Sequence, residues 1–142
     1  MNEEKLREII VEEAPDAIMY ADRDGIIRLW NEGAQRIFGV AKAEALGRSL
    51  DLIIPERLRA RHWQGYHQTM ATGVSRYGHQ LLRVPALKGD GDQFSSEFSI
   101  VLVRDEFGPP LGVAAILRDV SAQRHREQEL KERIAVLAGP AK

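Results

Sequence analysis

The sequence feature that most constrains the fold is a predicted β-hairpin near the N-terminus. Two β-prone runs, residues 17–21 and 26–30, flank the segment 22–25, which has the sequence DRDG. Glycine adopts a positive φ without steric cost, so Asp-Gly between two such runs strongly indicates a tight turn. The two strands of a hairpin are antiparallel neighbours. The chain therefore has to build at least part of an antiparallel sheet.

Helical patterns lie on both sides of this hairpin. Residues 3–14 carry apolar side chains near helical spacing and end before a proline, which disfavours helical geometry in the preceding residue. Asn31 fits the N-cap of a short helix that stops at Gly39. A second short helix is predicted over residues 42–46. A longer helix is predicted over residues 55–71, because its initial proline suits a first helical turn.

Three strands and a final helix are predicted in the second half of the chain. The strands cover residues 76–87, 93–103 and 111–120. The last of them is nearly apolar throughout, which is typical of a strand in the centre of a sheet. Pro85 indicates that the first lies at an edge or contains a bulge. The segment 121–137 has the pattern of an exposed helix.

These elements predict one α+β domain with an antiparallel sheet flanked by helices. A chain of 142 residues is the size of one domain and can bury a continuous core. We expect a flanking helix over residues 1–14, a domain core over 15–119 and a linker or coiled-coil helix over 120–142. The last segment has an apolar edge of the width of a short coiled-coil seam, made by Leu130, Ile134 and Leu137.

Charge and cysteine content exclude several function classes. The net charge of −1 gives no electrostatic argument for binding nucleic acid or an anionic membrane. The chain has no cysteine, which excludes disulfides, thiolate metal sites and cysteine nucleophiles. No apolar run approaches the ~20 residues that cross a bilayer, and the acidic N-terminus does not resemble a secretory signal. We expect a cytoplasmic protein whose domain contacts neither nucleic acid nor membrane.

The carboxylates, serines and glycines form no recognisable catalytic site. Asp22 and Asp24 fit turn residues rather than an acid–base pair. Ser95, Ser96 and Ser99 lie on a predicted strand without the sharp turn that a nucleophilic serine needs. The glycines are spread among turns and form no phosphate-binding loop. We therefore predict a protein that is not an enzyme and has no catalytic residues.

The ordered set of motifs resembles the PAS family of sensor domains over residues 5–137. The matching segments are EEAPDAIMYADRDGIIRLWNEGAQRIFG, ALGRSLDLIIPE, KGDGDQFSSEFSI and GVAAILRDVSAQRHREQEL. The resemblance implies a five-stranded antiparallel sheet with short helices across one face, enclosing a pocket. It also implies a homodimer formed through the terminal helices and a signal passed to an attached output module, such as a histidine kinase, a cyclase or a DNA-binding domain. The photosensory branches of the family need a cysteine, which this chain lacks.

His62 is the candidate ligand-binding residue. On the predicted helix 55–71, one stripe of side chains four residues apart should face the sheet, made by Leu58, His62, Tyr66 and Met70. Imidazole is a common axial ligand of haem iron. Gly65 has no side chain that would block a flat macrocycle. Across the gap we expect an apolar wall made by Tyr77, Leu81, Leu82, Phe98 and Ile100.

A narrower resemblance, to the haem-binding oxygen-sensing kinases of the FixL type, points to the same histidine. Arg61-His62, Thr72-Gly73 and Asp90-Gly91 fall in a similar register to their counterparts in that group. The distal arginine of those kinases corresponds to Leu82, and their tyrosine three residues after the histidine corresponds to Gly65. The resemblance therefore implies haem b with iron bound by His62, without the cation that stabilises bound oxygen.

A structural role for His62 is the alternative. Many PAS domains with no known haem carry a histidine in this region, where it hydrogen-bonds within the core or lies partly in solvent. The protein would then be a ligand-free dimerisation or interaction module, or would bind an unknown small molecule. His67 and His79 belong to no recognisable metal-binding motif. His62 is therefore the one metal ligand that the sequence suggests.

Overall fold

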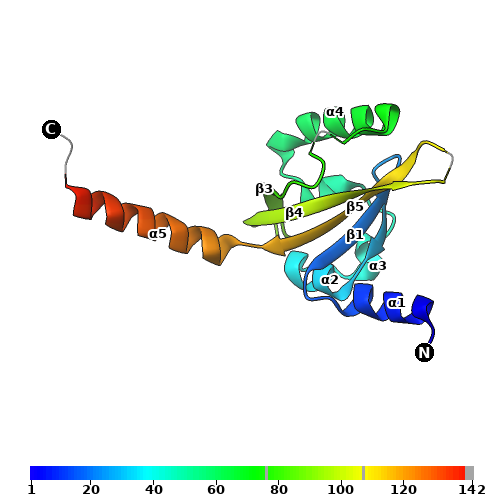
Figure 1. Ribbon diagram of the computed structural model, residues 1–142, viewed down its shortest axis with the longest axis horizontal. Helices are drawn as coiled ribbons and strands as arrows, with labels where there is room; N and C mark the ends of the chain where they lie inside the picture. Colours follow the sequence, from blue (N-terminus) through cyan, green and yellow to red (C-terminus); the bar gives the residue numbers. More distant parts are fainter. Residues whose placement is uncertain (76, 107, 140–142) are drawn as a thin grey trace.

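The computed structural model describes residues 1–75, 77–106 and 108–139. Its centre is a five-stranded antiparallel sheet in the order β2-β1-β5-β4-β3, which confirms the predicted α+β fold (Figure 1). The strands are β1 (Ala17–Asp22), β2 (Ile27–Trp30), β3 (Leu82–Leu87), β4 (Gln93–Arg104) and β5 (Pro110–Asp119). The central place of β5 and the edge position of β3, which contains Pro85, are both as predicted.

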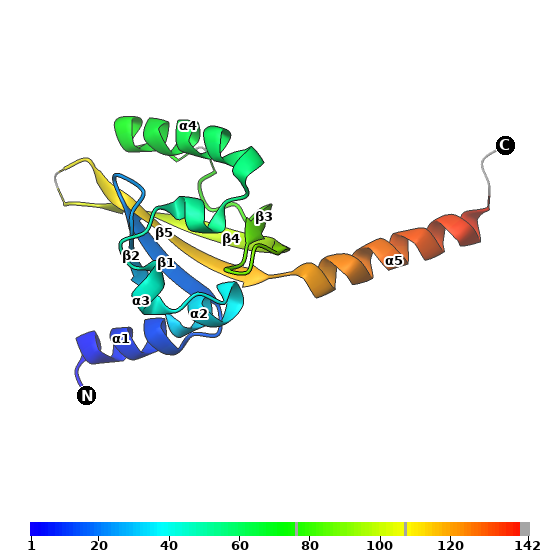
Figure 2. The same ribbon diagram turned by 180° about the vertical axis from the view of Figure 1, so that it is seen from behind.

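The connecting helices lie on one side of the sheet, and the terminal helices flank it (Figure 2). The helices are α1 (Glu3–Glu13), α2 (Glu32–Phe38), α3 (Lys42–Ala45), the 3-10 helix η1 (Leu50–Ile53), α4 (Glu56–Thr72) and α5 (Ser121–Ala138). α1 is joined to α3 by an ion pair of 2.9 Å between Glu12 and Lys42. α4 lies across the sheet near the β1–β2 turn, at the opposite end from α1 (Figures 1 and 2).

The predicted hairpin is present, and Asp22 builds its turn. The Oδ1 atom of Asp22 accepts hydrogen bonds from the backbone N–H groups of Asp24 (2.9 Å) and Ile26 (3.1 Å). Gly25 has a φ of 76°, which is the conformation that made glycine the expected residue there. β2 begins at Ile27, one residue later than predicted, and Ile26 instead forms an isolated bridge with Ser49.

β3 is shorter than the predicted strand 76–87. Arg76, where that strand was expected to begin, lies outside the described residues. The strand starts only at Leu82, because the preceding backbone turns. Gly78 has a φ of 57°, and the N–H of Gln80 donates to the carbonyl oxygen of Tyr77 over 3.0 Å. The prediction that extended backbone runs through residues 77–81 is therefore wrong.

The core lies between the sheet and the helices α2 to α4. Alternate residues of β1 face it, as the period of a strand requires. Trp30 and Phe38 are 1% and 0% exposed, and their ring centroids lie 5.2 Å apart. The indole N–H of Trp30 donates to the carbonyl oxygen of Val40 over 2.9 Å. This buried aromatic pair, with its one polar group satisfied, packs α2 against the sheet.

Asn31 joins three elements of the fold. As predicted, it is the N-cap of α2, where its Oδ1 accepts from the N–H of Ala34 over 2.8 Å. The same oxygen also accepts from the N–H of Ile18 over 2.8 Å. Its Nδ2 donates to the carbonyl oxygens of Val11 (2.8 Å) and Asp16 (3.0 Å). The side chain is 1% exposed, so a buried amide connects α1, β1 and α2.

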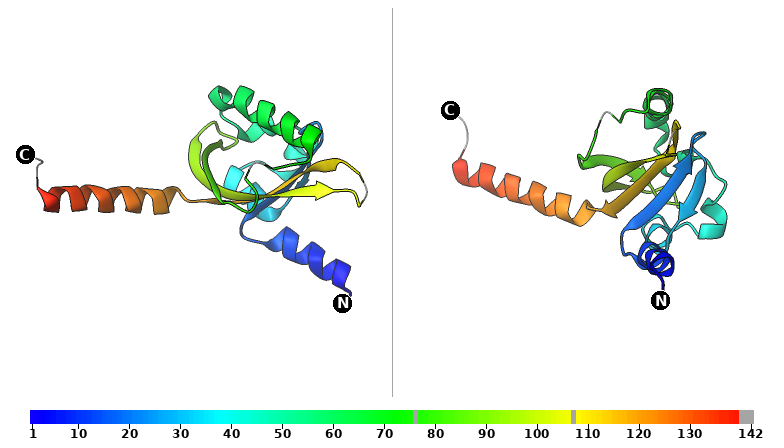
Figure 3. Two further views of the ribbon diagram at one scale, coloured as in Figure 1. Left: turned by 45° about the horizontal axis from the view of Figure 1, so that its top comes forward. Right: turned by 45° about the vertical axis from the view of Figure 1, so that its right-hand side comes forward.

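α5 extends away from the sheet as a continuation of β5 (Figure 3). Leu130, Ile134 and Leu137 are 58%, 59% and 86% exposed, so the coiled-coil seam stays a prediction. Residues 140–142, the end of the predicted C-terminal segment, lie outside the described residues. Within the described ranges, no helix has the length and apolar character needed to cross a membrane.

Candidate functional site

The candidate site is centred on His62, in the middle of α4. The helix follows Pro55 and ends at Gly73, which has a φ of 71°, close to the predicted ends. The imidazole is half-buried. Among the described residues, its Nδ1 is the only buried side-chain nitrogen or oxygen atom without a hydrogen-bond partner. A buried polar atom that lacks a partner is uncommon and costs free energy. This atom is therefore the strongest structural sign of a ligand site.

Two aromatic side chains beside His62 fix α4 to the rest of the domain. The hydroxyl of Tyr66 donates to the carbonyl oxygen of Asp22 over 2.5 Å, and burial raises the pKa of this hydroxyl. The indole N–H of Trp63 donates to Asp51 Oδ1 over 2.7 Å. The same indole lies against Gly25, where an added Cβ would come within 2.1 Å of the ring. These contacts set the rotation of α4 about its own axis.

The imidazole packs against both of these rings. Its centroid lies 4.8 Å from that of Trp63 and 5.6 Å from that of Tyr66. Burial lowers the pKa of His62, Asp51 opposes this effect and His67 adds to it. The imidazole is therefore held in its neutral form at neutral pH. Neutral imidazole is also the form that binds a metal ion.

The predicted helix stripe is only partly buried. Tyr66 and Met70 are 7% and 5% exposed, whereas Leu58 is half-buried. Gly65 is exposed, and an added Cβ there would meet no atom within 4 Å. The backbone at Gly65 therefore borders open space, and no neighbouring element of the chain requires a glycine there.

The predicted opposite wall comes from β3 and β4 alone. Leu82 pairs with Phe98 across these strands, and Ile100 lies two residues further along β4 on the same face. All three are half-buried, so the protein covers this apolar surface incompletely. Tyr77 and Leu81 are 40% and 65% exposed and precede β3. The prediction that these two residues lie on a strand facing α4 is wrong, because the backbone turns at Gly78 and β3 begins only after it.

Sequence reasoning missed Asp51, which organises the side of α4 next to His62. Besides the bond from Trp63, its carbonyl oxygen accepts from Arg59 Nη2 over 3.2 Å. Asp51 lies in a short 3-10 helix outside α4. No helical or strand periodicity in the sequence therefore links it to Trp63. In the described ranges, no three His, Cys, Asp or Glu side chains lie close enough together to hold a metal ion. A metal at His62 would therefore not be held by three such side chains of the described residues.

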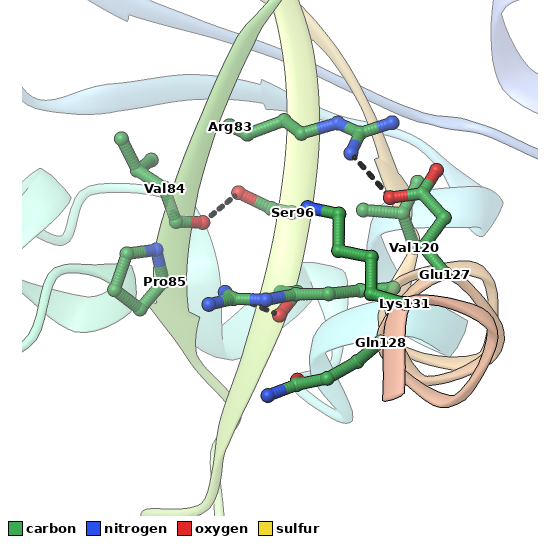
Figure 4. Close-up of a pocket in the computed structure, with 10 residues that line it drawn as sticks. Arg83, Val84, Pro85, Ser96, Val120, Glu127, Gln128 and Lys131 are labelled. Carbon is green, nitrogen blue, oxygen red and sulfur yellow. Dashed lines mark hydrogen bonds and ion pairs between the residues drawn. The ribbon is translucent and has the colours of Figure 1, made fainter. Parts of the chain in front are cut away.

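A surface groove lies away from His62, between the β3–β4 edge and the start of α5 (Figure 4). It is lined by strand residues that include Val84 and Ser96 and by Arg124, Gln128 and Lys131 of α5. Its lining combines charged side chains, such as those of Arg124 and Glu127, with apolar ones, such as those of Val84 and Val120. This groove is therefore a separate feature from the candidate ligand site.

The lowered pKa of His62 predicts that the domain loses stability as pH falls below about 7. The unfolded chain takes up a proton near the ordinary histidine pKa of 6.5, whereas the folded domain resists it. The unfolded state then binds more protons, so the free energy of unfolding decreases between pH 6.5 and the lower pKa of the folded state. Urea unfolding at pH 7.5 and 5.5 measures this slope. The variant His62→Gln should reduce it, and the exposed control His79→Gln should not; an equal slope in both variants would contradict the assignment.

Comparisons with known proteins agree with this geometry. A family model described as the PAS fold matches residues 11–125. The chain is 40% identical over 126 residues to Sensor protein FixL of Bradyrhizobium diazoefficiens, covering 87% of this chain and 24% of FixL. It is 22% identical over 118 residues to Oxygen sensor protein DosP of Escherichia coli, covering 83% of this chain and 14% of DosP.

A solved structure shows the same fold. The PAS domain of a protein from Colwellia psychrerythraea superposes with a TM-score of 0.74 at 21% identity, covering 85% of this chain and 99% of that chain. The curated relatives are much longer proteins, and the chain spans between 14% and 24% of their length. The similarity therefore concerns one domain of each relative.

Proposed function

This chain belongs to the PAS-fold family, and from that premise we propose that it is a sensory domain whose ligand is haem b bound through His62. Two of its relatives carry the names of sensors, and one of these is named an oxygen sensor. The observation that carries the ligand assignment is the buried Nδ1 of His62, which has no partner among the described residues. The proposal includes no catalytic step by the domain itself.

The residues around His62 fit a haem in three respects. The imidazole is held neutral by burial, as iron ligation requires. The half-buried side chains of Leu82, Phe98 and Ile100 offer an apolar surface to a macrocycle. The register around His62 is similar to that of the FixL-type kinases. When bound, haem iron supplies a site for a small gaseous ligand, whose affinity depends on the surrounding side chains.

The chain's own residues would orient the imidazole and exclude water. The contacts of Trp63 with Asp51 and of Tyr66 with the Asp22 carbonyl hold α4, so the ring at His62 has a defined direction. Met70 belongs to the buried core and Phe98 packs against it, so both would add apolar surface that excludes water from a bound haem. Leu82 stands where the FixL-type kinases have their distal arginine. The chain therefore supplies no cation at that position, and tight stabilisation of bound oxygen is not part of the proposal.

The visible spectrum tests the haem assignment. Protein expressed with added haem should show a Soret band, and His62→Ala should abolish or strongly shift it. Free imidazole should restore the spectrum of that variant, because it supplies the missing ligand. The matched control is His67→Ala, an exposed histidine of the same helix, which should keep the band. A wild-type protein without a Soret band, or an unchanged band in His62→Ala, would refute the assignment.

A second candidate function is a ligand-free interaction module in which His62 is structural. The packing of its ring against Trp63 and Tyr66 favours this alternative. In that case the wild-type protein shows no Soret band, and His62→Ala lowers the free energy of unfolding by leaving a gap beside the two rings. The spectrum and the unfolding of the same protein samples therefore distinguish the two candidate functions.

We also propose that the domain forms a homodimer through α1 and α5 and relays its signal to an output module, such as a histidine kinase or a cyclase. The exposed apolar edge of α5 supports the dimer, and the much greater length of FixL supports an attached module. A cytoplasmic location, without direct contact of this domain with nucleic acid or membrane, belongs to the same proposal. Small-angle scattering with and without ligand tests the relay, and an unchanged dimer shape would count against it.

A further inference from the structure

The start of α5 is fastened to the sheet by β4. The N–H of Val120 donates to the carbonyl oxygen of Ser95 over 2.8 Å, and the N–H of Ser95 donates to the hydroxyl of Ser121 over 3.0 Å. Val120 is 4% exposed. These contacts fix the position at which the helix begins. Further along, Arg124 Nη1 donates to the hydroxyl of Ser95 over 3.3 Å. The direction of the helix depends on this bond and on the contact beyond it.

Of the described hydrogen bonds and ion pairs between α5 and the sheet, the furthest along the helix is an ion pair with β3. Arg83 Nη1 lies 3.2 Å from Glu127 Oε2, and Figure 4 shows the arginine reaching from the strand to the helix. In the part of the chain that the structure describes, no hydrogen bond or ion pair joins α5 to the sheet beyond Glu127. Among the described residues, Glu127 is therefore the last position of α5 that a hydrogen bond or ion pair connects to the sheet.

The same guanidinium is anchored on the sheet. Arg83 Nε lies 2.9 Å from Glu97 Oε2, and the Glu97 side chain is only 15% exposed. Arg83 and Glu97 are direct partners in the β3–β4 register. One arginine thus bridges a fixed carboxylate on the sheet and a more exposed carboxylate on α5. Its hydrogen bond lowers the pKa of Glu127, so the bridge is charged at neutral pH.

The bridge lies one residue along the strands from Leu82 and Phe98, which belong to the haem site under the proposed function. Leu82 pairs with Phe98, and the next pair along the two strands is Arg83 with Glu97. Successive side chains of a strand point to opposite faces. The first pair therefore faces the helices, and the second faces the side from which α5 leaves. A movement of β3 against β4 at Leu82 and Phe98 has to move the bridge as well.

We propose that Arg83 is a clamp that holds α5 at a fixed angle to the sheet, and that loss of its pair with Glu127 lets the helix swing. Exposed ion pairs are weak and are screened by salt. A clamp of this kind is closed only in part, so a small displacement of β3 changes the fraction of molecules in which α5 is held. Glu127 precedes the apolar edge that starts at Leu130. The clamp therefore also sets the direction in which that edge faces.

A distance measurement on ligand-free protein tests the clamp. The chain has no cysteine, so spin labels can be attached at Glu44→Cys on α3 and Arg133→Cys on α5, both exposed positions. Labelled chain is diluted with unlabelled chain so that only distances within one molecule are measured. Arg83→Gln and Glu127→Gln should each broaden the distance distribution about twofold, since either change opens the clamp. The double variant should be no broader than either single variant, because both changes remove one interaction.

The matched control is Arg28→Gln. Arg28 forms an ion pair of 2.9 Å with Asp22 at the surface of the β1–β2 hairpin, and β2 is the edge strand opposite β3. This variant should keep the wild-type distribution. High salt should broaden the wild-type distribution but leave the Arg83 and Glu127 variants unchanged. A distribution that stays narrow in Arg83→Gln, or that broadens equally in Arg28→Gln, would overturn the clamp. Because no haem is present, the result is independent of the test of His62.

Discussion

Replacing Asn31 with alanine is expected to lower the free energy of unfolding by about 3 to 5 kcal/mol, through loss of a helix cap and of buried hydrogen bonds. All four hydrogen-bonding positions of this amide are used, two as acceptor and two as donor. Alanine removes the cap of α2 and leaves buried backbone groups of β1 and of the α1–β1 segment without partners. Urea unfolding followed by circular dichroism measures the change. It would be a large share of the ~5–15 kcal/mol by which domains are usually stable.

Asn2→Ala is the matched control for this prediction. Asn2 caps α1 with the same kind of bond, from the N–H of Lys5 to its Oδ1 over 2.8 Å, but it is exposed. Its replacement should cost about 1 kcal/mol or less, as for an ordinary exposed cap. The difference between the two variants then measures the buried bonds alone. Equal losses in both would show that the buried network at Asn31 contributes little.

Replacing Gly33 with alanine is expected to destabilise the domain by about 2 to 4 kcal/mol, as overpacking against a rigid neighbour does. Gly33 lies in the first turn of α2, and an added Cβ would come within 2.0 Å of the carbonyl oxygen of Asp16 and 2.8 Å of that of Ala14. Both neighbours are backbone atoms, so no side-chain rotation relieves the clash. The segment between α1 and β1 has to move away from α2.

Gly65→Ala makes the same chemical change in α4 and should have the opposite effect. An added Cβ there would meet no atom within 4 Å. Alanine favours a helix over glycine by about 1 kcal/mol, so this variant should be slightly more stable than the wild type. Thermal and urea unfolding of the two variants provide the comparison. A loss of stability in Gly65→Ala, or none in Gly33→Ala, would contradict the packing described here.

The local elements of this fold were predictable from the sequence because short-range chemistry determines them. The Asp-Gly turn, the cap at Asn31 and the stop at Gly39 each depend on residues within a few positions of one another. The central place of β5 followed from its apolar run. Residues 77–81 were predicted incorrectly. Gly78 has a positive φ, but a single glycine within a run of this kind does not by itself indicate a turn.

The candidate site was only partly predictable, because its geometry depends on contacts distant in sequence. The sequence identified His62, but not the contacts of Trp63 with Asp51 and Gly25 that decide how α4 is rotated. The prediction that Tyr77 and Leu81 form part of the apolar wall was wrong, because β3 begins later than predicted. The pair of Arg83 with Glu127 joins residues far apart in the chain, and no periodic pattern indicates it.

The bond from Asn31 to the Val11 carbonyl also bears on where the folding unit begins. The sequence suggested a core that starts at residue 15, with α1 as a separate flanking helix. A chain shortened to that boundary would lack the Val11 carbonyl, and the buried amide would lose one of its two acceptors. Truncation just before residue 15 should therefore weaken the attachment of α2 to the sheet, even though α1 has no buried residue of its own. The smallest independently stable form of this domain is expected to retain the last turn of α1.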